Sequence, residues 1–435
     1  PPPAPQTKSY FREVVDDRIV LMVQEAGGPG RQALPAGTLP GSVRRFEASP
    51  DGRHVAIVTG AEGADWGEVR ILDTARNTLL PVTLPHVRFE GPVAWSADGT
   101  GLLYRRFAPP RDGRREAPAE KPAIYLHRVD KPDRPDERLF ELPADQSDWN
   151  LLFNLPSDRR RLFAHIERGP WHDGNLGGAR ASVRMLDLQA DGSPAPGAAP
   201  RLLADATAAW RVLHVADGRA LVFTDHHAPR RRVVWMPLDR SEPSMWRDVV
   251  PQGEAVITQA EWFGGRLVVH AIENVSSVVR TYGADGTRLS DIPLPGTGVV
   301  QALLGDADSP RVALLYSGLL QSPVMLQHDL AKGTSRAHPA TGAPDLSSFE
   351  TRQEWFTSRD GTRVPMFVVA RRGAPRDGRH AVILFGYGAS GSSVLPSFRE
   401  DAVAWLQMGG VYALANVRGG NEFGNAWYRA ATRER

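Results

Sequence analysis

The sequence predicts an all-β β-propeller followed by a short α/β region. Two observations predict the propeller: apolar runs of strand length recur between turn residues from about residue 17 to 335, and Ser-x-Asp-Gly turns recur with them. A third observation predicts the α/β region. Beyond residue 345, apolar runs of the kind found in buried strands alternate with a segment of helical spacing.

Two segments carry the repeat most clearly, FEASPDGRHVAIVTG at 46–60 and VAWSADGTGLLYRRF at 93–107. Each contains the end of one strand, a Ser-x-Asp-Gly turn and then an alternating strand. Asp-Gly suits a two-residue hairpin, because glycine accepts a positive φ and the Asp side chain can bond its own backbone.

Weaker copies of this unit follow along the chain at 151–166, 212–223, 260–272 and 302–316. Each copy is followed by an outer strand that ends in a turn. A four-stranded unit that repeats every ~40–60 residues is typical of a β-propeller; a pair of β-sandwiches with accidental similarity is the alternative. Six units are visible, and 17–28 would supply the last strands of another. We therefore expect seven blades over 17–345.

The region beyond residue 345 contains four expected elements. The segment 357–372 reads as a hairpin with its own Ser-x-Asp-Gly turn, and 380–388 reads as a strand buried on both faces. Helical spacing over 398–410 ends at Gly409–Gly410, and 411–420 reads as a second buried strand. A strand–helix–strand series of this length indicates a crossover between parallel strands.

The stretch LFGYGASGSS at 384–393 is open to three interpretations. Gly386-x-Gly388-x-x-Gly391 spells a dinucleotide-binding turn. That turn needs a helix that begins at the glycines and an acidic residue at the end of the next strand. Here the helix begins later and the next strand ends in Asn416, so the sequence argues against nucleotide binding.

Ser390 invites the second interpretation, a nucleophile on a tight turn. Such a turn needs Gly-x-Ser-x-Gly, which occurs nowhere in the chain. The third interpretation is the loop after the third strand of an α/β-hydrolase, which supplies hydrogen-bond donors to an oxyanion. The flanking glycines would then let the backbone bend so that the Tyr387 hydroxyl, or a backbone N–H, points at the reacting oxygen; the alternative is a tyrosine that only packs.

These residues resemble the prolyl oligopeptidase family of serine peptidases. The resemblance is strongest in TSRDGTRVPMFVV, LFGYG and MGGVYALANVRGGNEFGNAW, and it extends back through the two clearest propeller repeats. It implies an all-β seven-bladed β-propeller plus the N-terminal part of an α/β-hydrolase domain. The expected divisions are 1–16 for an N-terminal segment belonging with the hydrolase domain, 17–345 for the propeller and 346–435 for the first part of the peptidase domain.

The resemblance also implies roles for single residues. Tyr387 matches the tyrosine whose hydroxyl helps to form the oxyanion hole. Ser390 stands where the family's prolyl peptidases often have a phenylalanine lining the proline pocket, so Ser390 is an expected substrate-binding residue and strict proline specificity is not implied. The family's catalytic Ser, Asp and His all lie beyond the Arg418-Gly-Gly segment, so the triad is not expected in this chain.

The implied function is that of a serine-type endopeptidase or oligopeptidase that cleaves short peptides, with the propeller gating access. The 435 residues alone are not expected to be active, and a separate fragment carrying the rest of the catalytic domain is a candidate partner. Neither a metal nor an organic cofactor is implied. The alternative is a non-catalytic propeller protein that binds peptides or protein partners.

Composition narrows the partners and the compartment. The chain contains 52 Lys+Arg and 50 Asp+Glu, a net charge of +2, so we expect no nucleic-acid partner. We interpret the arginine runs at 158–163 and 229–234 as charged turns and His226–His227 as loop residues. The absence of cysteine excludes disulfides and a thiol nucleophile. No apolar stretch approaches the ~20 residues of a membrane helix, so we expect a soluble protein of the cytoplasm or periplasm.

Overall fold

The computed structural model describes residues 8–25, 28–88, 91–110, 120–146, 149–167, 180–339 and 342–431. The chain divides into two compact units, one that ends at Val212 and one that begins at Leu213. Each unit is described by itself.

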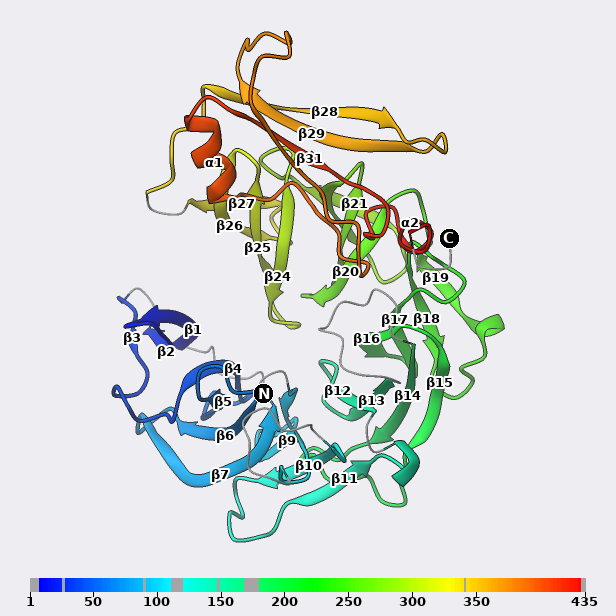
Figure 1. Ribbon diagram of the computed structural model, residues 1–435. Coiled ribbons are helices and arrows are strands. Elements are labelled where there is room, and N and C mark those ends of the chain that lie inside the picture. Colours follow the sequence, from blue (N-terminus) through cyan, green and yellow to red (C-terminus); the bar gives the residue numbers. More distant parts are fainter. Residues whose placement is uncertain are drawn as a thin grey trace. The chain divides into compact units, whose positions relative to one another are not determined.

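The first unit consists of antiparallel sheets whose strands follow one another in chain order (Figure 1). A three-stranded sheet comes first, followed by three sheets of four strands. These sheets are formed by β1 (Lys8–Val15), β2 (Arg18–Glu25) and β3 (Arg31–Gln32); β4 (Ser42–Ala48), β5 (His54–Gly60), β6 (Trp66–Asp73) and β7 (Thr78–Arg88); β8 (Val93–Trp95), β9 (Gly101–Arg106), β10 (Ala123–Arg128) and β11 (Glu137–Glu141); and β12 (Asn150–Asn154), β13 (Arg161–Glu167), β14 (Ala181–Asp187) and β15 (Arg201–Ala208).

The second unit continues the same pattern in three further four-stranded sheets. The first strand of these, β16, contains the division between the units. They are formed by β16 (Trp210–Ala216), β17 (Arg219–Thr224), β18 (Arg232–Pro237) and β19 (Arg247–Val250); β20 (Val256–Phe263), β21 (Arg266–Glu273), β22 (Ser276–Tyr282) and β23 (Arg288–Ile292); and β24 (Val299–Gly305), β25 (Arg311–Gly318), β26 (Gln321–Asp329) and β27 (Thr334–Pro339). Two short 3-10 helices, Ala144–Gln146 and Pro243–Met245, lie in connections.

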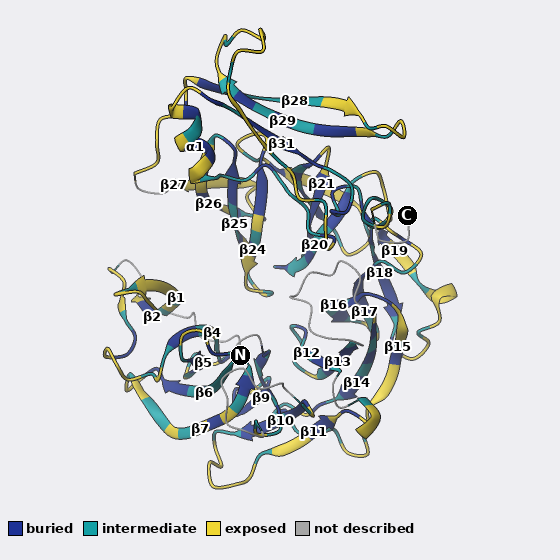
Figure 2. Ribbon diagram, in the orientation of Figure 1, coloured by how far each residue is buried: buried dark blue, intermediate teal, exposed yellow. Residues whose placement is uncertain are grey.

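Burial differs between the strands of one sheet. The second strands are almost wholly buried, as in β5, while the fourth strands β7 and β15 expose many side chains (Figure 2). The second strand packs its apolar side chains against both neighbouring strands and adjacent sheets, whereas a fourth strand has a neighbour on one edge only. The predicted four-stranded repeat is therefore confirmed. Seven as the number of blades stays a prediction, as do the domain boundaries, and residues 8–15 of the predicted N-terminal segment form β1 paired with β2.

Local side chains explain the hairpin turns. Ser49 Oγ donates to Asp51 Oδ1 at 2.6 Å and accepts from the His54 N–H at 3.0 Å, while Gly52 adopts a φ of 70°. Residues 49–53 thus make a longer turn than the two-residue hairpin that Asp-Gly suggests. A two-residue turn does occur at Asp217–Gly218, where both residues have positive φ.

The α/β region forms one mixed sheet in the order β28-β29-β31-β30. Its elements are β28 (Phe349–Thr357), β29 (Arg363–Arg371), β30 (Val382–Phe385), α1 (Glu400–Gln407), β31 (Val411–Ala415) and the short α2 (Asn425–Arg429). The pair β30–β31 is parallel and the other pairs are antiparallel. Since α1 lies between β30 and β31 in the chain and packs on β31, the predicted strand–helix–strand crossover is confirmed.

One face of this sheet buries the apolar stripe of α1. Ala402, Val403 and Leu406 pack with Phe367 and Leu414 of the sheet. The same cluster contains Val275 and Leu319, which come from turns of the preceding four-stranded sheets. The α/β region therefore shares one core with the four-stranded sheets of the second unit.

The prediction that residues 380–388 form a strand buried on both faces is wrong. Val382, Ile383 and Leu384 are 56%, 42% and 67% exposed. Among the described residues β30 is an edge strand, paired with β31 on one side only, so its apolar side chains remain exposed. The second predicted strand, β31, is buried as expected.

Candidate functional site

Two loops leave the sheet at the carboxyl ends of two neighbouring strands, β30 and β31. Because β30 and β31 run parallel, the residues after Phe385 and after Ala415 emerge side by side at their carboxyl ends. The Gly391 N–H donates to the Gly419 carbonyl at 2.9 Å, which fastens the first loop to the second. These two loops, 386–394 and 416–424, form the candidate site.

Glycines permit this close approach. Gly388 has a φ of 64°, and a Cβ there would lie 2.6 Å from the Arg418 carbonyl oxygen. Gly419 has a φ of 101°, and a Cβ there would collide with the Gly388 carbonyl. Gly419 of the Arg418 motif is thus needed because the Gly388 backbone occupies the space that a side chain at this position would fill.

Tyr387 lies at the exposed end of the first loop. Its side chain is 55% exposed, and its hydroxyl has no hydrogen-bond partner among the described residues. A phenol O–H in this position is free to donate to a group that enters from solvent.

Ser390 lies in the same loop, three residues further. It is exposed and adopts a φ of 57°, which is uncommon for a residue with a side chain. Within the ranges that the structure describes, no histidine bonds its hydroxyl, so nothing there activates it as a nucleophile. The two residues singled out from sequence therefore share one loop.

Arg418 connects the second loop to the β28–β29 hairpin. Its guanidinium is bonded to Asp360 and lies 3.3 Å from Thr362 Oγ1 and 3.4 Å from Ser358 Oγ. The bond from Arg418 and the Thr362 N–H lower the pKa of Asp360 to about 2. The Ser358-x-Asp-Gly turn is therefore an anchor for the candidate site as well as a hairpin.

Sequence reasoning missed two buried polar residues behind the loop. Glu422 is 2% exposed and its Oε1 accepts the Val394 N–H at 2.8 Å, while Asn416 is fully buried and donates from Nδ2 to the Val394 carbonyl. A charged residue two positions after a Gly-Gly pair is expected from sequence to lie in solvent. Its burial becomes visible only when the loops are in contact.

A turn of the β16–β19 sheet also contacts the first residue of α2, directly after the site's second loop. The Asn425 N–H donates to the Pro229 carbonyl at 3.2 Å, and its amide donates to Asp225 at 3.3 Å. His226 and His227 lie edge to face in this turn, as loop residues. Arg231, which sequence reads as part of a charged turn, is instead buried, and burial lowers its pKa.

Hydrogen-bonded Ser–His pairs occur elsewhere in the second unit, inside the sheets. His270 Nε2 lies 2.8 Å from Ser277 Oγ, and His328 Nδ1 lies 2.8 Å from Ser335 Oγ. Ser277 is buried and also accepts the Val300 N–H, so its hydroxyl is committed to the fold. The pair at Ser277 therefore belongs to the framework and not to a reactive site.

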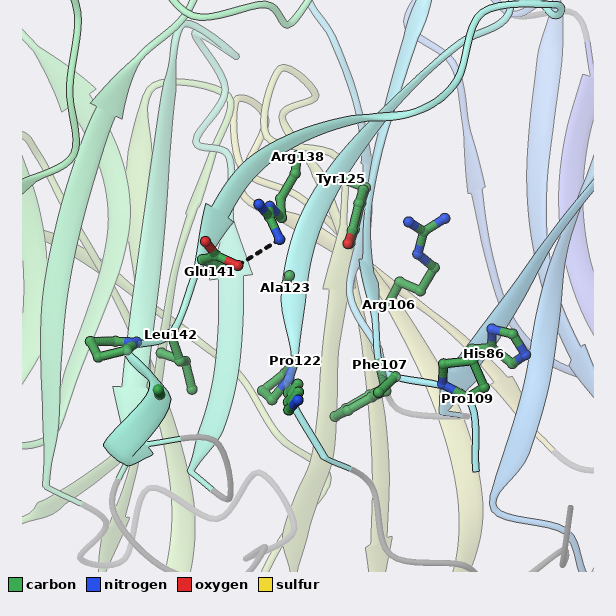
Figure 3. A pocket seen from close by; sticks show the side chains of 14 residues that line it. His86, Arg106, Phe107, Pro109, Pro122, Ala123, Tyr125, Arg138, Glu141 and Leu142 are labelled. Atoms are coloured by element: carbon green, nitrogen blue, oxygen red, sulfur yellow. Dashed lines mark ion pairs between the residues drawn. The ribbon is translucent and has the colours of Figure 1, made fainter. Parts of the chain in front are cut away.

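A cavity of about 770 Å³ lies in the first unit, between β9, β10 and β11 (Figure 3). Arg138 pairs with Glu141 at 2.7 Å, and Arg106 lies over the Tyr125 ring at 3.7 Å. Arg106 also lies 3.6 Å from the Asp136 carboxylate, so both arginines that line this cavity have an acidic partner. Over the described residues, no group of three or more His, Asp or Glu side chains could hold a metal ion, and no helix is long and apolar enough to cross a membrane.

Comparisons with known proteins agree with this fold. The prolyl endopeptidase of Elizabethkingia miricola is 24% identical over 90% of this chain, and the dipeptidyl aminopeptidase BI of Pseudoxanthomonas mexicana is 26% identical over 91%. The chain spans about half of these relatives, 54% and 52% of their length.

Solved structures match over nearly the whole chain. One from a study of two prolyl endopeptidases has a TM-score of 0.84 and 25% identity, covering 99% of this chain and 62% of the other. The peptide-bound prolyl oligopeptidase B of Galerina marginata has a TM-score of 0.83 at 20% identity, covering 99% of this chain and 64% of the other.

The family model for the N-terminal β-propeller domain of prolyl oligopeptidase matches residues 35–340. This range contains the six four-stranded sheets from β4 to β27. The chain belongs to the prolyl oligopeptidase family.

Proposed function

We propose that this chain forms the propeller and the oxyanion-donating part of a serine peptidase that cleaves short peptides by acyl transfer. One observation carries the proposal: the Tyr387 hydroxyl, unpartnered among the described residues, lies on a glycine-flanked loop at the carboxyl edge of two parallel strands. A donor aimed at the developing oxyanion typically contributes ~10²–10³ in rate.

Family membership supports the peptidase assignment. The relatives are named as prolyl endopeptidases, a dipeptidyl aminopeptidase and macrocyclase-peptidases, and structures of one homologue are titled as peptide complexes. In the proposed reaction, a serine activated by a histidine, itself oriented by an aspartate, attacks the scissile carbonyl. This triad would come from residues outside the 435-residue chain, on the same polypeptide or a separate fragment.

The open edge of β30 supports the addition of further catalytic-domain strands. Among the described residues no strand pairs with the edge of β30 that faces away from β31, and the aliphatic side chains of β30 are exposed. In the proposed substrate site, Ser390 offers a small hydroxyl in place of an aromatic ring. A pocket with less apolar area at this position would bind proline less selectively than an aromatic-lined one.

The test uses the full-length protein that contains this chain. Tyr387→Phe is expected to lower kcat/KM on a short peptide about 10²–10³-fold while labelling by a fluorophosphonate probe persists. Tyr428→Phe is the matched control, because it keeps the ring against Gly391 and also removes one hydroxyl. Equal activities of the Tyr387→Phe variant and the wild type would contradict the oxyanion role.

A second measurement tests where the nucleophile lies. The 435-residue chain alone is expected to remain unlabelled by the fluorophosphonate probe. Labelling of this chain would mean that it holds an activated serine, which the proposal denies. No labelling of the full-length protein either would favour a non-catalytic propeller protein.

A further inference from the structure

We propose that Glu422 is a positioning residue, whose buried carboxyl, together with the Asn416 amide, clamps the Val394 peptide and so fixes the conformation of the Tyr387 loop. The consequence for turnover rests on the proposed function of Tyr387. The clamp itself is a statement about the loop and can be tested without activity.

The clamp holds one residue of the loop by both of its backbone polar groups. Glu422 Oε1 accepts the Val394 N–H at 2.8 Å, and Asn416 Nδ2 donates to the Val394 carbonyl. Both side chains come from the loop after β31, while Val394 belongs to the loop after β30. Together with the bond from Gly391 to Gly419, three hydrogen bonds tie the two loops along their length.

The clamp is built into a tight space. Glu422 is 2% exposed, and a Cβ on Gly420 would collide with its carboxyl group. Asn416 is fully buried, and its own N–H donates to the Pro365 carbonyl of β29 at 3.0 Å. The sheet therefore holds the Asn416 end of the clamp, and the packed glycine lets the carboxyl approach the backbone.

The chemistry of the carboxyl fits a neutral hydrogen-bonding role. Burial raises the pKa of Glu422, against the smaller opposing effect of the Val394 N–H bond. Among the described residues Oε2 has no partner, and Arg418 of the same loop is bound to Asp360. A buried oxygen without a donor favours the protonated form. Oε1 can then still accept the Val394 N–H.

Two substitutions separate the hydrogen bond from packing. Glu422→Met keeps the length of the side chain and removes the acceptor, whereas Glu422→Gln keeps an acceptor at the Oε1 position. Amide hydrogen exchange in 387–394 is expected to be about five- to tenfold faster in Glu422→Met and close to wild type in Glu422→Gln. Glu400→Gln, at an exposed position at the start of α1, is the control.

The pH dependence of unfolding gives a second readout. Because the folded-state pKa is raised, the folded protein holds the Glu422 proton more tightly than the unfolded chain, whose value is near 4.5. Wild type should therefore lose stability relative to Glu422→Gln as pH rises from 4.5 through the folded pKa, and the stability difference should no longer change with pH below 4.5.

The outcomes distinguish this inference from the proposed function. If exchange in 387–394 is the same in Glu422→Met and wild type, or equally fast in the Met and Gln variants, the clamp is wrong whatever Tyr387 does. If the clamp is seen and Tyr387→Phe keeps full activity, only the proposed role of Tyr387 fails. If both stand, Glu422→Met in the full-length enzyme should lower kcat more than it raises KM, and Glu422→Gln should restore kcat.

Discussion

The turn at 49–53 and the loop at 386–394 are both polar connections with left-handed residues, but they are held in different ways. In the turn, Ser49 and Asp51 bond groups no more than five residues away. In the loop, the bonds to Val394 come from residues 22 and 28 positions further along the chain. The side chains that hold the turn belong mostly to the turn itself, with added hydrogen bonds from Thr74 to the Gly52 and Arg53 carbonyls. The side chains that hold the loop come from a second segment.

This difference means that the conformation of the loop with Tyr387 depends on the position of a second segment. A self-contained turn re-forms whenever its strands pair, so it suits a repeated framework. A loop held by another loop changes shape when either segment moves, so its conformation can respond to neighbours. Three predictions test this distinction, in order of expected size.

The largest expected effect comes from adding a methyl group between the two loops. Gly419→Ala should destabilise the second unit by about 4 kcal/mol or displace the loop, because its Cβ would collide with the Gly388 carbonyl at a φ of 101°. Gly218→Ala, in a two-residue hairpin turn with open space around Gly218 and a φ of 69°, should cost only about 1–2 kcal/mol. Urea unfolding of both variants compares them, and equal costs would break the distinction.

The next effect is the pH dependence of stability, which differs between a buried histidine in the sheets and the carboxyl group beside the loop. Burial lowers the pKa of His270, between Thr258 and Ser277, to about 4. The folded state then binds fewer protons than the unfolded state between pH 4 and 6.5, so stability should fall on the order of 3 kcal/mol as pH drops through this window. The pKa of Glu422 is raised by burial instead, so its contribution to stability is lost as pH rises.

The measurement is the midpoint of thermal unfolding of the second unit between pH 8 and 4. His270→Gln should flatten the acid-side loss, although it lowers stability at pH 8 by removing a fitted hydrogen-bonding ring. Glu422→Gln should leave the acid-side loss intact. If His270→Gln leaves the slope between pH 6.5 and 4 unchanged, the sheet does not contain the titrating group.

The smallest effect probes the turn itself. Ser49→Ala removes a buried hydroxyl that bonds Asp51 and His54, and should cost about 1–2 kcal/mol because the His54 N–H loses its partner. Ser9→Ala, on exposed β1, should stay within ~0.5 kcal/mol of wild type. Chemical denaturation of the first unit compares the two, and a Ser49→Ala cost as small as the control would show that the turn is not held by this side chain.

The sequence predicted those features whose causes are local. The repeated strands followed from alternating apolar residues, and the turns followed from Ser, Asp and Gly at fixed spacing. The crossover of β30, α1 and β31 followed from the lengths of the apolar runs. The loop with Tyr387 and Ser390 was found from glycines next to a strand end, although no finding yet tests the role of either residue.

The features that the sequence missed depend on contacts between distant segments. Val382, Ile383 and Leu384 form an apolar run that is typical of a buried strand. Burial depends on which strands lie alongside, and among the described residues β30 pairs with one strand only. Glu422 carries a charged side chain of the kind expected at the surface, but it is buried because it lies against Gly420 and Val394. Both errors arise because a side chain's own chemistry does not specify its surroundings.

The exposed edge of β30 has a consequence for the behaviour of this chain in concentrated solution. A short aliphatic strand with free backbone groups is a template for pairing with the same strand of a second molecule. The chain by itself should therefore associate as its concentration rises, through a contact unrelated to peptide binding. A lysine in place of Leu384 would oppose this association at little cost to the fold, since that side chain already lies 67% in solvent.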